Sequence, residues 1–191
     1  MHATGGNFEG GVAESEQKFK ELLIYISEQS EGDSSYGATK ANKILFFADF
    51  LAYLYLGRSI TGWSYERMNH GPVPVDIYST RNEMELEDSL LVYDRDYHGN
   101  RQTRYVARRQ PDLSMFSAEE ISLVDRLLRE NWGKSARDIS DESHRFAGWA
   151  FAHDREIIPY EVALVNFREP TPAEIEYGQS LIPLVEMGVY Q

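Results

Sequence analysis

The sequence contains no cysteine among its 191 residues. This absence excludes disulfide frameworks, cysteine-ligated zinc, iron–sulfur clusters and a cysteine nucleophile. The five histidines show no HExxH or other paired metal-ligand spacing, so we predict neither a metal nor another cofactor. Glycine-rich nucleotide-binding motifs and the GxSxG element of serine hydrolases are also missing. These absences together predict a protein that is not an enzyme.

Basic residues are scarce, because 19 Lys and Arg stand against 31 Asp and Glu, for a net charge of −12. This balance disfavours nucleic acid as a partner, since phosphate contacts need clustered lysine and arginine, and it favours a protein partner. The longest apolar run, 44–56, is interrupted by Asp49 and is too short to span a bilayer. No cationic segment followed by an apolar core opens the chain. We therefore expect a cytoplasmic protein without a membrane partner.

Aromatic residues are plentiful, with 12 Tyr, 9 Phe and 3 Trp to fill a core. Amphipathic spacing predicts a first helix over 14–29. A second, central helix is apolar on every face and is predicted to run from a cap at Thr39 to Leu56. Gly57 is expected to end this helix in the left-handed conformation.

The segments that follow predict a strand over 63–68, a third helix that has Pro74 in its first turn and runs through Asp76 to about Glu87, and two strands over 90–94 and 103–107. Helix, helix, strand, helix, hairpin is the order of a winged helix. Capping patterns at Ser117 and Ser135 predict further helices beyond this point. The predicted fold class is α+β and mostly helical, with a winged-helix-like N-terminal portion that carries a β-hairpin, and C-terminal helices sharing one core.

The domain organisation follows from glycine content and apolar periodicity. We expect a flexible tail over 1–13, one folded domain over 14–165, and a C-terminal extension with a short helix over 166–191.

Opposite charges separate onto neighbouring elements. Residues 73–88 hold one arginine and five acidic residues, whereas 89–111 hold five arginines and two aspartates. An acidic helix opposes reading of a DNA groove, and a basic hairpin is either a solvated face or a docking surface for an acidic protein. A winged-helix DNA-binding autoregulator remains the alternative. We predict a partner-binding surface formed by Asp76, Tyr78, Glu83, Tyr97, Arg101 and Arg104.

Several segments resemble, in order, the signatures of one known family. Residues 43–49 (KILFFAD), 57–62 (GRSITG) and 69–74 (NHGPVP) resemble successive motifs of the Panacea domain of SocA-like antitoxins. Residues 139–144, Trp149 and 158–161 resemble the later Ser-His, Trp and Pro-Tyr signatures. The resemblance covers about 19–161 and departs at His70, where the family often has tyrosine. It implies an antitoxin of a bacterial or phage toxin–antitoxin pair, whose partner is a cognate protein toxin encoded beside it.

The family signatures also imply a set of structural residues. Asp49 lies in the most apolar helix, and burying an unpaired carboxylate costs several kcal/mol. We therefore expect Asp49 to accept hydrogen bonds from tyrosine hydroxyls, backbone amides or Arg58, and not to act as a catalytic acid. His144 is expected to cap or bond a neighbouring element, with a partner contact as the second choice. The complete structural set is Lys43, Asp49, Gly57, Gly71, Pro72, Ser143, His144, Trp149, Pro159 and Tyr160.

Overall fold

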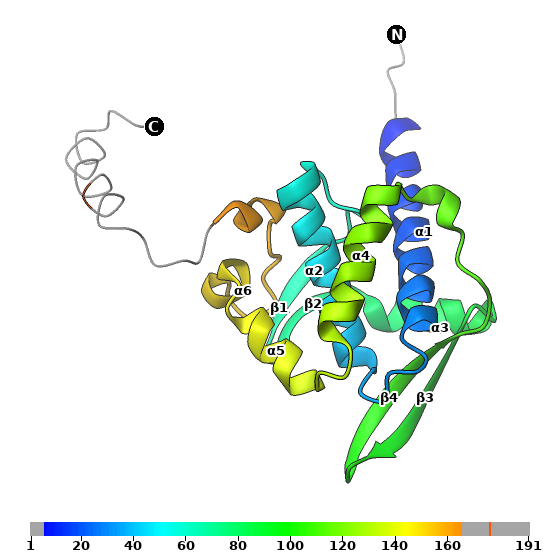
Figure 1. Ribbon diagram of the computed structural model, residues 1–191. Coiled ribbons are helices and arrows are strands. Elements are labelled where there is room, and N and C mark those ends of the chain that lie inside the picture. Colours follow the sequence, from blue (N-terminus) through cyan, green and yellow to red (C-terminus); the bar gives the residue numbers. More distant parts are fainter. Residues whose placement is uncertain (1–5, 166–175, 177–191) are drawn as a thin grey trace.

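The computed structural model describes residues 6–165 and residue 176 (Figure 1). The short helix expected within 166–191 lies outside the described residues, apart from residue 176. Helices surround a central helix, and two antiparallel hairpins complete the fold. In chain order the elements are α1 (Gly6–Gln29), α2 (Ala38–Leu56), β1 (Tyr65–Met68), β2 (Gly71–Pro74), α3 (Ile77–Leu86), β3 (Leu90–Tyr97), β4 (Asn100–Ala107), η1 (Leu113–Met115), α4 (Ala118–Asn131), α5 (Ala136–His144), α6 (Ala147–Phe151) and η2 (Tyr160–Leu164).

Helix α2 is the centre of the fold, as its apolar sequence predicts. It packs against α1, α4, α5, η2 and both hairpins, which explains why it needs apolar side chains on every face. Its predicted end at Gly57 is confirmed, because that residue is left-handed (φ 75°) and its N–H donates to the Tyr53 carbonyl.

The predicted start of α2 at Thr39 is wrong. The N-cap is Gly37, and no side chain caps the helix there. A Cβ at Gly37 would lie 2.8 Å from the Thr103 carbonyl oxygen, because β4 packs against this end of the helix. The close approach of β4, which the local sequence does not reveal, therefore explains why glycine stands at this N-cap.

Helix α1 is longer than expected. It begins at Gly6, within the stretch assigned to a flexible tail, and not at residue 14. Once a helix is nucleated, each further residue whose φ and ψ angles become fixed adds one backbone hydrogen bond. Extension of the helix therefore does not require an apolar face. Val12 is 67% exposed, which fits an extension beyond the packed part of the helix.

The first hairpin contains a strand that the sequence did not predict. We expected one strand over 63–68 and placed Pro74 in a helix, but β1 pairs with β2 and Pro74 ends β2. Met68 opposite Gly71 closes a two-residue turn, so the hydrogen-bonded pairs are Met68–Gly71 and Glu66–Val73. Pro72 and Pro74 occupy the alternate positions, where the ladder needs no N–H donor.

The second hairpin is longer than its predicted strands and projects away from the helices (Figure 1). His98 and Gly99 form its two-residue turn, both with positive φ (53° and 76°). Its base packs against α1, α2 and α3.

The C-terminal helices begin where their capping patterns predict. Ser117 with Glu120, and Ser135 with Asp138, each form a capping box. Buried side chains from both halves of the chain, such as Phe46 and Val124, belong to one core cluster. The mostly helical α+β class is therefore confirmed, while the winged-helix likeness stays a prediction. No helix in the described part of the chain is long and apolar enough to cross a bilayer.

Candidate partner-binding groove and its buried supports

A groove of about 870 Å³ lies between the N-terminal half of α2, both hairpins and α3. We call it the α2–α3 groove. Three of the predicted partner-binding residues line it, namely Asp76, Tyr78 and Arg101. Tyr78 is 68% exposed, and Asp76 adopts a left-handed conformation (φ 56°) with no capping hydrogen bond from its side chain. The groove therefore presents an exposed aromatic ring beside an uncommitted carboxylate.

Glu83 and Tyr97 do not line this groove. Glu83 accepts a hydrogen bond from Lys20 Nζ of α1 at 3.1 Å, so it joins α3 to α1. Tyr97 lies beside the turn of the second hairpin, where it lines a separate pocket. These five residues are thus divided between the groove, the contact of α3 with α1 and the turn of the second hairpin.

Arg104 is an internal clamp, which corrects its assignment to an exposed docking surface. It is only 4% exposed, and its guanidinium donates to three backbone carbonyls of the loop between α1 and α2. These carbonyls belong to Asp33 (2.6 Å), Tyr36 (2.9 Å) and Glu31 (3.0 Å). Arg104 therefore holds the base of the second hairpin against this loop.

The other four arginines of 89–111 also contact partners within the chain, although the side chains of Arg101, Arg108 and Arg109 remain 41–78% exposed. A count of charges along the sequence does not show which of them are neutralised by contacts with distant elements. The acceptors are Asp94 for Arg101, Asp88 for Arg108, Glu21 for Arg109, and the Ser34 carbonyl for Arg95.

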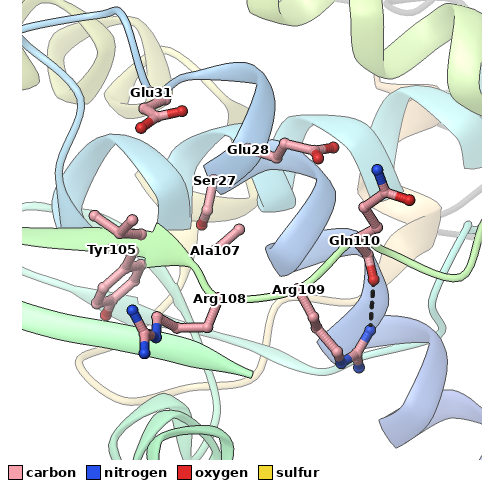
Figure 2. A pocket seen from close by; sticks show the side chains of 9 residues that line it. Ser27, Glu28, Glu31, Tyr105, Ala107, Arg108, Arg109 and Gln110 are labelled. Atoms are coloured by element: carbon pink, nitrogen blue, oxygen red, sulfur yellow. Dashed lines mark hydrogen bonds between the residues drawn. The ribbon is translucent and has the colours of Figure 1, made fainter. Parts of the chain in front are cut away.

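Figure 2 shows a smaller pocket, of about 280 Å³, between α1 and the end of β4. Arg109 donates there to the Gln110 carbonyl at 2.9 Å, drawn as the dashed line, and also pairs with Glu21. Glu28 and Glu31 stand on the opposite wall. Because its arginines are already paired and carboxylates face them, this pocket offers less free charge than the α2–α3 groove.

Several signature residues meet at the floor of the α2–α3 groove. Lys43 is 1% exposed and donates to the Pro72 carbonyl at 2.8 Å. Burial away from water lowers the pKa of Lys43 to about 7. Gly71 has a positive φ (97°), and a Cβ there would collide with Ser143 Oγ and Lys43 Cε. Glycine is therefore required at 71 both by backbone conformation and by space.

His144 and Trp149 form the neighbouring support. Their rings stack at 3.9 Å between centroids, and the Trp149 indole N–H donates to the Met68 carbonyl at 2.8 Å. The Arg67 guanidinium lies 4.9 Å from the Trp149 ring. His144 Nε2 is buried without a hydrogen-bond partner in the described part of the chain, so the expected polar bond is replaced by ring stacking. Burial lowers the pKa of His144, and the nearby charge of Lys43 adds to the effect.

Asp49 makes the hydrogen bonds expected of a buried carboxylate. It accepts from the Thr61 N–H (2.7 Å), from the Thr61 hydroxyl and from the Tyr65 hydroxyl (2.6 Å). Complete burial raises its pKa, although these hydrogen bonds act in the opposite direction. Arg58 is not a donor to Asp49, because it pairs with Glu120 at 3.3 Å.

The last signature residues attach the C-terminal segment to α2. Pro159 precedes η2, and the Tyr160 ring packs against Phe50 and Tyr53 with centroid distances of 4.7 and 5.7 Å. The Tyr160 hydroxyl donates to the Trp63 carbonyl. Within the described residues, no three His, Asp or Glu side chains form a group able to hold a metal.

Sequence reasoning missed two residues of the groove wall, Arg81 and Arg155. Arg81 had a signal, because it is the single basic residue of the acidic segment 73–88. Arg155 had none, since it reaches the groove through the pairing of residues 155–158 with the outer edge of β1.

Residues 42–150 match the family described as antitoxin SocA-like, Panacea domain. The chain belongs to this family. The Panacea domain match begins in α2 and ends in α6, so it contains most of the groove wall and its buried supports, while Arg155 lies beyond it. A comparison with curated proteins gives no match, and neither does a comparison with solved structures.

Proposed function

We propose that this Panacea-domain protein is an antitoxin that neutralises a toxin encoded by a neighbouring gene through direct binding, without catalysis or a cofactor. The observation that carries the proposal is the family match over residues 42–150, which supply most of the wall of the α2–α3 groove. An antitoxin of this kind needs a surface able to hold another protein in a stoichiometric complex. Interfaces of that kind bury about 1,600 Å² in total and reach nanomolar affinity.

The exposed side chains of the groove support this use. Tyr78 combines a large ring with a polar tip, which suits it to act as an interface anchor. The Arg81 guanidinium lies 4.5 Å from the Tyr78 ring and orders it against α3. A ring that is already ordered loses less conformational entropy when a partner covers it.

The test is growth of cells that express the neighbouring gene, with and without this chain, followed by co-purification of both products. We expect toxicity that this chain relieves, and a stable complex of the two proteins. Neutralisation by binding requires at least equimolar antitoxin, so titration of the purified toxin should reach an end point set by stoichiometry. A harmless neighbour that forms no complex contradicts the proposal, and full protection at a small fraction of the toxin concentration contradicts the binding mechanism.

Tyr78→Ala is the first interface variant to make, with Leu86→Ala as its matched control. Both residues lie on α3 and are exposed, at 68% and 88%, but only Tyr78 lines the groove. We expect Tyr78→Ala to weaken toxin binding by at least about tenfold, as hot-spot tyrosines do, and Leu86→Ala to leave binding unchanged. Equal affinities for both variants would place the interface elsewhere.

The DNA-binding alternative retains one supporting observation, the order of helices and hairpins. A gel shift with the DNA upstream of the gene, at low salt, tests it. The internal pairing of the hairpin arginines leaves the second hairpin poorly equipped to contact phosphates, so we expect no complex.

A further inference from the structure

We propose that the α2–α3 groove binds an extended acidic segment of the protein partner, an inference that rests on the proposed function for the identity of that partner. The shape of the site is the first step. A second pocket, of about 580 Å³, lies between the outer half of β4 and the first residues of α2 and α5. It shares four lining residues with the groove, Ala38, Thr39, Arg101 and Thr103. The two hollows therefore adjoin along the second hairpin, and we call them together the trough. Their combined length suits an extended chain better than a compact small molecule.

The charge of this trough is opposite to that of the whole protein. The chain carries a net charge of −12, yet six lysines and arginines line the trough against two acidic residues, Glu66 and Asp76. The six cations are Lys40, Lys43, Arg81, Arg101, Arg137 and Arg155.

Three of these cations have no carboxylate partner among the described residues, although Arg81 also hydrogen-bonds to Tyr105 and lies against the Tyr78 ring. Lys40 and Arg101 are already paired, with Asp33 and Asp94, and Lys43 is buried. Arg81, Arg137 and Arg155 form no ion pair with any described residue. The Nε of Arg81 is also buried without a hydrogen-bond partner among those residues. These three cations lie in both pockets, so partner carboxylates spaced along one segment can meet them in turn.

The start of α2 adds to the positive potential of the trough. Ala38 and Thr39, in its first turn, line both pockets, the turn contains no acidic residue, and no side chain caps its N–H groups. The unpaired amides at a helix start carry partial positive charge that favours a nearby carboxylate.

An acidic protein segment fits this trough better than a nucleic acid does. A polyanionic backbone has to approach past the negative field of a chain with charge −12 and past Glu66 and Asp76 on the wall. A short acidic segment places its few charges only over the cations. The exposed ring of Tyr78 adds an apolar contact for a side chain of the same segment.

The test uses fluorescence anisotropy of a labelled hexaglutamate peptide with the full chain at low salt. Hexaglutamine and a twelve-residue oligothymidylate serve as the comparison probes. The groove variant is Arg81→Gln with Arg155→Gln, and Arg137→Gln tests the second pocket. The matched control is Arg129→Gln with Arg145→Gln, which changes net charge equally at exposed arginines outside both pockets.

We expect hexaglutamate to bind, hexaglutamine to bind at least about tenfold more weakly, and the groove variant to lose at least about tenfold in affinity. Arg137→Gln should lose about threefold, and the control less than twofold, with all differences shrinking as salt rises. No binding of hexaglutamate, or an equal loss in the groove variant and the control, overturns the proposal. Tighter and groove-dependent binding of oligothymidylate overturns it in favour of nucleic acid.

The same variants separate this inference from the antitoxin proposal. If the unaltered chain relieves toxicity and the groove variant does so with unchanged affinity for the toxin, the antitoxin function stands and the groove inference is wrong. If the unaltered chain relieves no toxicity, the antitoxin proposal is wrong, and the peptide titration still decides whether the trough binds acidic segments.

Discussion

Lys43 is a cation held out of water with one backbone carbonyl, that of Pro72, as its hydrogen-bond acceptor. Burial lowers its pKa from 10.5 to about 7, whereas in the unfolded chain the ammonium keeps its ordinary pKa. Between these two values the unfolded state binds more protons than the folded state. The free energy of unfolding therefore rises with pH from about 7 upwards, and the full penalty applies below pH 7.

Lys43→Met removes this dependence while filling a similar volume with an apolar chain. Between pH 6 and pH 9 we expect the free energy of unfolding of the unaltered chain to rise by about 2.5–3 kcal/mol relative to that of the variant. Urea denaturation at several pH values measures both, with Lys134→Met as the control because that lysine is half-buried and paired with Glu142. Parallel curves for the Lys43 variant and the unaltered chain would show that Lys43 does not titrate on folding.

A comparison of Gly71 with Gly57 distinguishes the cost of a left-handed backbone conformation from the cost of a steric clash. Both have positive φ, but only at Gly71 would a Cβ meet neighbouring atoms, Ser143 Oγ and Lys43 Cε, while Gly57 faces open space. We expect Gly57→Ala to cost about 1 kcal/mol of stability and Gly71→Ala at least about 3 kcal/mol. Chemical denaturation of the two variants measures the difference. Equal losses would mean that the floor of the groove yields to the added methyl group.

At the scale of the element, the second hairpin depends on Arg104. Arg104→Gln leaves the carbonyls of Glu31, Asp33 and Tyr36 without their donor, and we expect it to destabilise the protein by about 2–3 kcal/mol. Arg104→Lys should not restore this stability, because a single ammonium does not reproduce the guanidinium fork.

Arg101→Gln is the matched control on the same strand. Its ion pair with Asp94 is exposed and screened by solvent, so we expect little or no loss of stability. Hydrogen exchange should show faster exchange of β4 amides in the Arg104 variants and little change in the Arg101 variant. Unaltered β4 protection in Arg104→Gln would contradict the role of a clamp.

These elements also show what the sequence predicts and what it does not. Capping boxes at Ser117 and Ser135, and the left-handed Gly57, are local signals, and each marks a helix boundary correctly. The glycine N-cap of α2 is explained by the approach of β4, which is distant in the sequence. In the sequence the prolines of β2 are interpreted as a turn and a helix start, because their fit to alternate strand positions is visible only in the pairing with β1. Long-range contacts therefore explain the features that local patterns missed.

The candidate site was predictable only in part, for the same reason. Asp76, Tyr78 and Arg101 share one groove because two elements meet there, whereas Arg104 belongs to the interior although it lies three residues from Arg101 in the same strand. Charge counted along a segment does not distinguish an exposed arginine from one that is bound to backbone carbonyls.

At the scale of the whole molecule, both halves of the chain contribute to one buried cluster. We therefore expect a single cooperative unfolding transition, with the loss of helical circular dichroism coinciding with the change in tryptophan fluorescence. Trp63 and Trp149 are half-buried reporters in different parts of the fold. Separate midpoints for the two signals would show that the halves unfold independently.

The buried residues around the groove are held in place by hydrogen bonds to main-chain atoms. Lys43, Arg104, Trp149 and Tyr160 all donate to backbone carbonyls of other segments. A carbonyl is present whatever the side chain, so the accepting segments are free to change sequence without losing these bonds. The trough side chains proposed to meet the partner, Tyr78, Arg81, Arg137 and Arg155, contribute none of these bonds. Natural selection can accordingly remodel the exposed wall while the framework persists, which gives one scaffold the evolutionary latitude to acquire new binding partners.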